Sequence, residues 1–419
     1  MCLEWKVSRA MEERGVTMGK SLLHTPDGVR DTYGNECYKK LEVQKRIHRV
    51  LQQYGYEDIQ TPTFEFFDIF NQERGSVHSN EMYKFFDRDN QTLVLRPDIT
   101  PSIARCVAKY YEDETMPLRL CYQGNTFLNN SSYQGKLKEV TQVGAELIQD
   151  DKYQGDAEMI AMVVDSCLAA GLLEFQIEVG QVEYFKGIME ECCLVQEQQE
   201  QIRSFIENKN FLGLENFLEG KKVTEELKQL LLKFEFLYGG EEILEEAKHL
   251  TKNKRAIKAI ERLIKVHELL KFYGKEHYVS YDLGMLNLYD YYTGITFQGY
   301  TYGTGDAIVK GGRYNHLLKQ FGKDAPSVGF AFRVDELLFA LERQKLEITK
   351  IPDVTVILYG EGEIKNAILL AKELRAKQQK VELLAILNQE EEESYISYAK
   401  KKRAEKILKV KEDGEIVVI

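Results

Sequence analysis

Residues 127–146 read FLNNSSYQGKLKEVTQVGAE, and this stretch decides the fold because it joins two predicted strands. The first strand is LRLCYQGNTFL at 118–128, and the second is KEVTQVGAELIQ at 138–149. Both segments have the composition and the period-two pattern that strands prefer. The polar residues 129–135 lie between them, so the sequence predicts two consecutive strands joined by a polar loop.

One face of the second predicted strand carries candidate ligand groups. Period-two geometry places Gln142, Gly144 and Glu146 on the same face. A carboxylate can accept a hydrogen bond from an imidazole N–H, and a glutamine amide can bond an amino group. The glycine between the two polar side chains is expected to leave room for a ligand. In isolation, however, such residues are more often exposed to solvent than part of a binding site.

Composition limits the classes of function. The 419 residues are enough for two or three domains, and the net charge of -11 disfavours a nucleic-acid partner. The charged first twenty residues do not resemble a signal peptide, and no run of about 18 apolar residues occurs, so we expect a cytoplasmic protein without a membrane partner. The seven cysteines show no metal-ligand or disulfide spacing, so no metal site and no cofactor are predicted.

Outside the opening stretch the pattern alternates between helix and strand. A helix is predicted over 38–54, with Leu41 among its apolar residues, and Pro62 indicates an edge strand or a strand that meets a partner chain. Pro101 can open a helix at its first turn, and KGGRYNHLLKQFG at 310–322 is interpreted as a turn. The predicted segments are an N-terminal extension at 1–18, disordered or upstream of the natural start; the first part of a core at 19–185; a helical insert at 186–275; the second part of the core at 276–346; and a small α/β domain at 350–419.

Five motifs carry a resemblance to a known family. LRPDIT, TQVGAE, YDYYTGITF, GGRYNHLL and VGFAF occur in the order found in the catalytic core of histidyl-tRNA synthetase, over roughly residues 20–190 and 276–345. The chain is still more similar to the catalytically silent relatives of that enzyme, the regulatory subunits of ATP phosphoribosyltransferase. The resemblance implies an α+β fold of the class II aminoacyl-tRNA synthetase type: an antiparallel sheet of six strands flanked by helices, dimeric through the first helix and the Pro62 strand. The small C-terminal domain resembles a shortened anticodon-binding domain.

The resemblance also implies a histidine pocket. In the synthetases, the positions that match six residues of this chain hold histidine: Asp98, Thr100, Gln142, Glu146, Tyr291 and Tyr292. Asp98 and Thr100 would offer an acceptor and a hydroxyl to the ammonium group, and the two tyrosines would offer flat walls. Asp98 stands where the enzyme usually has the longer glutamate.

The residues that activate histidine in the synthetases are replaced. Three arginines of the family match Leu128, Asn287 and Glu336, and the acidic residue after the first arginine matches Asn130. Activation needs positive charge at the phosphates of ATP, and Glu336 would repel a phosphate. The sequence therefore predicts a pocket that keeps its amino-acid end and lacks its positive end. Lys136 or Lys138 is a candidate substitute for the arginine that meets the carboxylate of histidine.

Three functions stay open at this point. The favoured one is a non-catalytic subunit that binds histidine, self-associates through its core, and partners the short form of the ATP phosphoribosyltransferase catalytic subunit in the first step of histidine biosynthesis. The second is a divergent histidyl-tRNA synthetase, which Leu128 and Glu336 argue against. The third is another synthetase-derived protein that senses an amino acid.

Overall fold

The computed structural model describes residues 23–70, 77–130, 136–286, 291–346, 348, 353–402, 404–411 and 413–419. The predicted extension at 1–18 and Asn287 lie outside these residues. The chain forms two compact units, Met1–Ile348 and Thr349–Ile419. Within the described ranges, no helix combines the length and the apolar character needed to cross a membrane.

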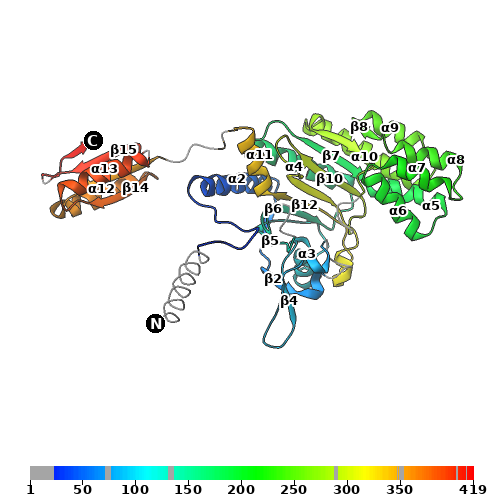
Figure 1. Cartoon of the computed structure of the whole chain (residues 1–419), viewed down its shortest axis with the longest axis horizontal. Helices are drawn as coiled ribbons and strands as arrows, with labels where there is room; N and C mark the ends of the chain where they lie inside the picture. Colours follow the sequence, from blue (N-terminus) through cyan, green and yellow to red (C-terminus); the bar gives the residue numbers. More distant parts are fainter. Residues whose placement is uncertain are drawn as a thin grey trace, which may run out of the picture. The chain divides into compact units, whose positions relative to one another are not determined.

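The first unit is built on a nine-stranded sheet (Figure 1). In spatial order its strands are β1 (Glu57–Asp58), β5 (Leu118–Phe127), β6 (Glu139–Ile148), β12 (Ser327–Arg333), β11 (Val309–Arg313), β10 (Ile295–Tyr300), β7 (Gln176–Gln181), β9 (Val279–Asp282) and β8 (Tyr238–Gly239). The six strands from β5 to β7 are antiparallel, as the resemblance implies. The expected count of six is too small, because β1 pairs in parallel with β5 and β9 pairs in parallel with β7.

Helices cover both faces of this sheet. On one face, α2 (Gly34–Gln53), α4 (Tyr153–Ala170) and α11 (Val334–Arg343) bury the side chains of β6 that point away from Glu146. On the other face, α3 (Thr100–Tyr110) and the short 3-10 helix η5 (Leu318–Phe321) pack against β5 and the end of β6. Pro101 stands in the first turn of α3, as predicted. Leu41, one of the apolar residues that indicated this helix, is 59% exposed and does not belong to the core.

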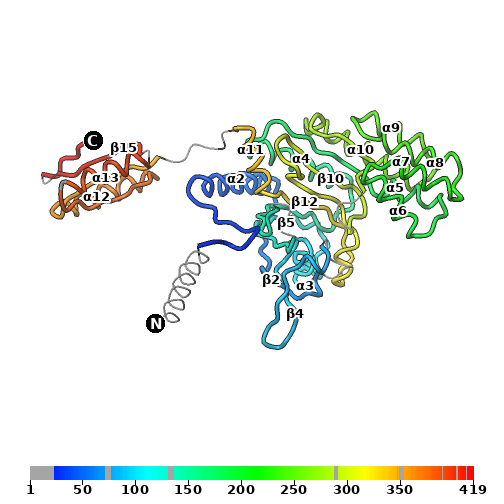
Figure 2. Tube along the Cα trace, in the orientation of Figure 1, coloured from blue at the N-terminus to red at the C-terminus, as the bar shows by residue number. Residues whose placement is uncertain are grey.

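A group of helices follows β7 directly. It consists of α5 (Val182–Cys192), α6 (Gln196–Glu207), α7 (Phe211–Glu219), α8 (Glu225–Lys233), α9 (Glu242–His249) and α10 (Lys254–Tyr273). Figure 2 shows these helices gathered on one side of β10. Asn253 caps α10 by accepting hydrogen bonds from two backbone N–H groups, which satisfies donors that the helix leaves free.

A small three-stranded sheet follows Pro62. Its strands, in spatial order, are β2 (Phe64–Phe66), β4 (Thr92–Leu95) and β3 (Lys84–Phe86). The 3-10 helices η1 (Phe67–Phe70) and η2 (Ser79–Glu81) flank the gap between β2 and β3. The predicted edge position is confirmed, since β1 and β2 each lie at the edge of a sheet. The strand is not continuous through Pro62: β1 ends before this proline and β2 begins after it, because a proline cannot donate to a strand ladder.

The second unit is a four-stranded sheet with a helix on each face. It contains β13 (Val354–Tyr359), η6 (Glu361–Glu363), α12 (Ile364–Ala376), β14 (Lys380–Ala385), α13 (Gln389–Lys401), β15 (Lys406–Val410) and β16 (Ile416–Val418). The spatial order is β14-β13-β15-β16, and only β16 is antiparallel to its neighbour. Ala367 of α12 packs on one face and Ala399 of α13 on the other, so this unit has an α/β core of its own.

Candidate functional site

A cavity of about 470 Å³ lies on the face of the large sheet that α3 covers. All six residues of the predicted histidine pocket line it: Asp98, Thr100, Gln142, Glu146, Tyr291 and Tyr292. They come from three separate parts of the chain, namely the start of α3, the strand β6, and the residues just before β10. The structure therefore brings the whole predicted set together around one space.

Glu146 is the most buried acidic group of this cavity, with 1% of its surface exposed. Thr100 Oγ1 donates a hydrogen bond to Glu146 Oε1 at 2.8 Å, and Tyr314 Oη donates one to Oε2. Burial raises the pKa of Glu146 to about 8; the two hydroxyls lower it and the charge of Asp98 raises it further. At neutral pH this carboxyl group is therefore largely protonated and can exchange its proton with a ligand.

A glycine on the neighbouring strand makes room for this carboxyl group. Gly329 of β12 is the cross-strand partner of Glu146, and a Cβ atom on Gly329 would overlap Glu146 Oε2. The expected role of Gly144 is wrong, because a Cβ there would lie 2.5 Å from Tyr122 Oη. The phenol of Tyr122 thus occupies the space that was predicted for a ligand.

Two predicted contacts at the ammonium end are rearranged. The hydroxyl of Thr100 donates to Glu146 and not to Asp98, while the backbone N–H of Thr100 donates to Asp98 Oδ1 at 3.2 Å. Tyr291 Oη donates to Asp98 Oδ2 at 3.3 Å, which orients the carboxylate that would meet an ammonium group. Gln142 Oε1 is buried and has no hydrogen-bond partner among the described residues, so it remains available to a donor on a ligand.

Tyr314 is a site residue that the sequence interpretation missed. It follows directly after GGR, and the interpretation of that segment as a turn is wrong, since Val309–Arg313 forms β11. Gly311 is required within this strand because a Cβ there would overlap the ring of Phe297. With the strand in place, Tyr314 is 2% exposed and faces Glu146. The available signal in the sequence was a tyrosine two residues after a glycine pair.

The prediction of a cavity without a positive end is also wrong. Three cationic residues line it: Lys136, Lys310 and Arg333. Lys136 was a candidate in the sequence, whereas Lys138 is absent from the lining and bonds through its backbone N–H to Gly28. The other two cations come from β11 and the end of β12.

Carboxylates neutralise two of these three cations. Asp306 Oδ2 lies 3.8 Å from Lys136 Nζ and 3.4 Å from Arg333 Nη1. Glu336, which matches an arginine of the synthetases, lies 3.6 Å from Arg333 Nη2 and is not part of the lining. Leu128 and Asn130 line the cavity as neutral side chains. The positive charge at this end therefore comes from residues other than the matched family positions.

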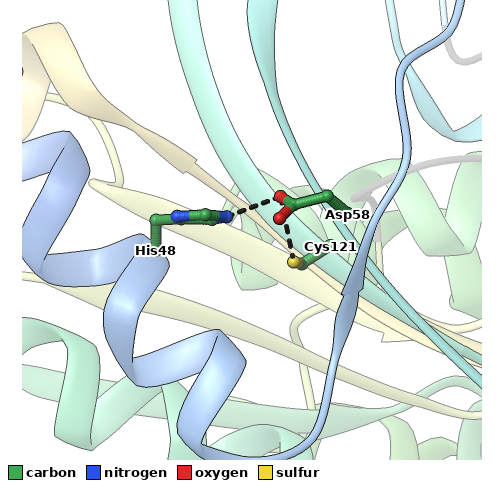
Figure 3. Close-up of side chains that lie close together, drawn as sticks. All are labelled: His48, Asp58 and Cys121. Carbon is green, nitrogen blue, oxygen red and sulfur yellow. Dashed lines mark hydrogen bonds and ion pairs between the residues drawn. The ribbon is translucent and has the colours of Figure 1, made fainter.

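A second cluster joins three elements on the far side of β5. His48 of α2, Asp58 of β1 and Cys121 of β5 have their donor atoms within 4.8 Å of one another (Figure 3). His48 Nε2 lies 2.5 Å from Asp58 Oδ1, and Cys121 Sγ donates to the same oxygen at 3.7 Å. Burial, with the charge of Asp58, raises the pKa of Cys121 to about 12, so the thiol stays protonated. Hydrogen bonds among the three side chains account for the cluster, and cysteine spacing in the sequence could not reveal it.

The comparisons with known proteins agree with this geometry. The family model described as histidyl-tRNA synthetase matches residues 28–337. The ATP phosphoribosyltransferase regulatory subunit of Acetivibrio thermocellus is 40% identical over 96% of this chain and 96% of its own, and that of Ruminiclostridium cellulolyticum is 38% identical over 96% and 95%.

Solved structures give the same fold. An ATP phosphoribosyltransferase regulatory subunit/histidyl-tRNA synthetase from Bacillus halodurans has a TM-score of 0.82 at 30% identity, over 92% of this chain and 97% of its own. Histidyl-tRNA synthetase from Nostoc sp. PCC 7120 has a TM-score of 0.78 at 20% identity, over 94% and 96%, and supports the fold alone. The predicted class II synthetase fold is confirmed.

Proposed function

The chain belongs to the family of ATP phosphoribosyltransferase regulatory subunits, and we propose that it regulates that enzyme by binding histidine in the cavity beside Glu146. Because the chain belongs to this family, it is the regulatory and not the catalytic subunit of the enzyme, and it has a role in histidine biosynthesis. The observation that carries the histidine proposal is the convergence of the six predicted residues on one cavity.

The chemistry of the cavity suits histidine. Glu146 passes its proton to the imidazole and then accepts the N–H of the imidazolium ion, while Thr100 and Tyr314 hold the resulting carboxylate in place. Asp98, oriented by Tyr291, accepts from the ammonium group, and the unpartnered Gln142 Oε1 accepts a second hydrogen bond from it. Each charge-assisted hydrogen bond of this kind contributes about 1.5 to 3 kcal/mol, so the three acceptors together support specific binding.

Chemical activation of histidine is not part of this proposal. Leu128 lines the cavity where the synthetases have an arginine, and Glu336 pairs with Arg333 instead of offering a cation. Pyrophosphate exchange into ATP in the presence of histidine should therefore stay at the level of a reaction without protein. Exchange above that level would instead support the alternative, a divergent synthetase.

The proposed partner is the short-form catalytic subunit of ATP phosphoribosyltransferase. The test is to co-express the two chains and to measure phosphoribosyl-ATP formation with and without histidine. Wild type should support an activity that histidine inhibits. Glu146→Gln should keep the activation and weaken histidine binding by about 1 to 3 kcal/mol. A catalytic subunit equally active and equally inhibited without this chain would end the proposal.

A cytoplasmic location belongs to the same proposal, supported by the free cysteines of the described residues.

We also propose that the core forms a dimer through α2 and the small sheet after Pro62. Phe64 and Phe66 of β2 are 53% and 51% exposed, and Phe86 of β3 is 69% exposed. Leu41 of α2 is exposed as well. Aromatic side chains grouped on a surface in this way are typical of protein interfaces.

The absence of a nucleic-acid partner remains a prediction from the net charge of -11.

A further inference from the structure

We propose that Lys310 forms a carboxylate-binding subsite of the cavity, which takes the α-carboxylate of the bound amino acid in place of the arginines that this chain lacks. This inference rests on the proposed histidine site and adds to it the residue that selects a ligand with a carboxylate over the corresponding neutral amide.

Strand register places Lys310 at a suitable distance from Glu146. Lys310 is paired with Ala331 of β12, and Ala331 is paired with Gly144 of β6, two residues before Glu146. Paired residues of antiparallel strands point to the same face. Lys310 lies two strands away from Glu146 across the sheet and two residues away along the strand direction. These two offsets together separate the two Cα atoms by about 12 Å. Both side chains line the cavity, so a ligand with an imidazole at one end and a carboxylate at the other can bridge them.

The charge of Lys310 is the one at this end without an ion pair. Lys136 and Arg333 share Asp306, and Arg333 also meets Glu336. Within the described ranges, no carboxylate oxygen lies within 4.0 Å of Lys310 Nζ. Lys310 is the cation that a ligand anion can reach without first displacing a carboxylate of the protein.

Burial gives this arrangement an energetic reason. Lys310 is half-buried, and its pKa is lowered by that burial and then by the charge of Arg333, while Asp306 raises it. An ammonium held away from water without a counter-ion costs free energy, and an anion that arrives beside it offsets the cost. The empty protein thus keeps a half-buried ammonium group in the cavity lining that forms no ion pair with the described residues, and carboxylate binding would offset part of that cost.

The test compares two ligands of the same shape. L-Histidinamide replaces the carboxylate of histidine by a neutral amide and leaves the imidazole and the ammonium group in place. Wild type, in complex with the catalytic subunit, should bind histidine about 10- to 100-fold more tightly than histidinamide, the ratio expected for one charge-assisted hydrogen bond. Lys310→Met should reduce this ratio to near one by weakening histidine binding, with little change for histidinamide. Isothermal titration calorimetry measures all four affinities.

The controls separate a ligand contact from a structural role. Lys138→Met, at a lysine outside the cavity, should keep the wild-type ratio, and Lys310→Arg should keep most of it because the charge remains. Since Lys310→Met removes an unpaired half-buried charge, thermal unfolding without ligand should show no loss of stability. If Lys310→Met did not fold, loss of the ratio in Lys310→Gln would serve the same purpose.

The possible failures are distinguishable. If histidine and histidinamide lost affinity equally in Lys310→Met, or if the ratio persisted, the subsite would be refuted while the histidine site stood. If wild type bound neither ligand in the presence of the catalytic subunit, the proposed histidine site itself would be refuted.

Discussion

The carboxyl group of Glu146 is buried, and both of its hydrogen-bond donors are neutral hydroxyls. Burial disfavours the ionised form more strongly than these two hydrogen bonds favour it, which is why the pKa rises to about 8. In the unfolded chain the same group would titrate near pH 4.3. Between these two values the folded protein binds a proton that the unfolded chain does not.

This difference predicts how stability depends on pH. The contribution of Glu146 is fully present below about pH 4.3 and is lost as pH rises through about 8. The free energy of unfolding of wild type, relative to that of Glu146→Gln, should therefore fall by roughly 3 to 5 kcal/mol across this range. Urea unfolding of both proteins at pH 5, 6.5 and 8, without histidine, measures it. A difference that stayed constant would show that Glu146 titrates normally.

At the scale of elements, β11 joins the cavity to the opposite face of the sheet. Tyr314 follows its last residue and reaches Glu146, while Arg313 points to the other side. Arg313 Nη2 lies 2.7 Å from Asp156 Oδ1 of α4, and Arg262 Nε lies 2.6 Å from Asp156 Oδ2. Asp156 is 0% exposed, so its negative charge is compensated by these two arginines and not by water.

The corresponding prediction concerns Arg313→Met. The change leaves a buried carboxylate with one cation instead of two, and we expect a loss of about 3 kcal/mol in the free energy of unfolding, the lower end of the range for broken buried ion pairs. Arg46→Met is the control: it breaks an i,i+4 pair with Glu42 on α2 and should cost about 0.5 kcal/mol. Equal effects of the two substitutions in chemical denaturation would contradict the structural role of Arg313.

The sequence predicted those helices and strands whose pattern of apolar residues or prolines lies within the element itself. The pair β5 and β6 follows from alternation, and the start of α3 follows from Pro101. The strand character of β11 could not be predicted, because its glycines suit a strand only where the ring of Phe297 packs over it from β10. The exposure of Leu41 likewise depends on a surface that helical periodicity does not reveal.

The site divides in the same way. The acidic end was predicted because its residues stand at matched family positions, and the cavity gathers all of them. The basic end was missed because Lys310 and Arg333 occupy positions where the family motif gave no reason to expect a charge. Their convergence depends on the register of β6, β12 and β11, which brings together residues far apart in sequence.

At the scale of the whole molecule, the proposed dimer gives a direct prediction. Phe66→Glu places a charge within the exposed aromatic surface of the small sheet, where burial of an unpaired carboxylate would oppose association. The variant should elute as a monomer in size-exclusion chromatography with light scattering, where wild type elutes as a dimer. Phe272→Glu, at an exposed phenylalanine of α10, should remain dimeric. A dimeric Phe66→Glu would place the interface elsewhere.

The proton on Glu146 also determines how histidine binding at the proposed site should depend on pH. The empty cavity holds one proton below about pH 8, and free imidazole is neutral above about pH 6.5, so one shared proton between imidazole and carboxylate leaves the total unchanged on binding. Between these limits the occupancy should follow histidine concentration and be indifferent to the acidity of the surroundings. Calorimetric titrations near pH 7.2 should then give the same apparent enthalpy in phosphate and in Tris, two buffers whose heats of ionisation differ widely. A buffer-dependent enthalpy would mean that binding releases the proton to water, and feedback would then vary with the acidity of the cell.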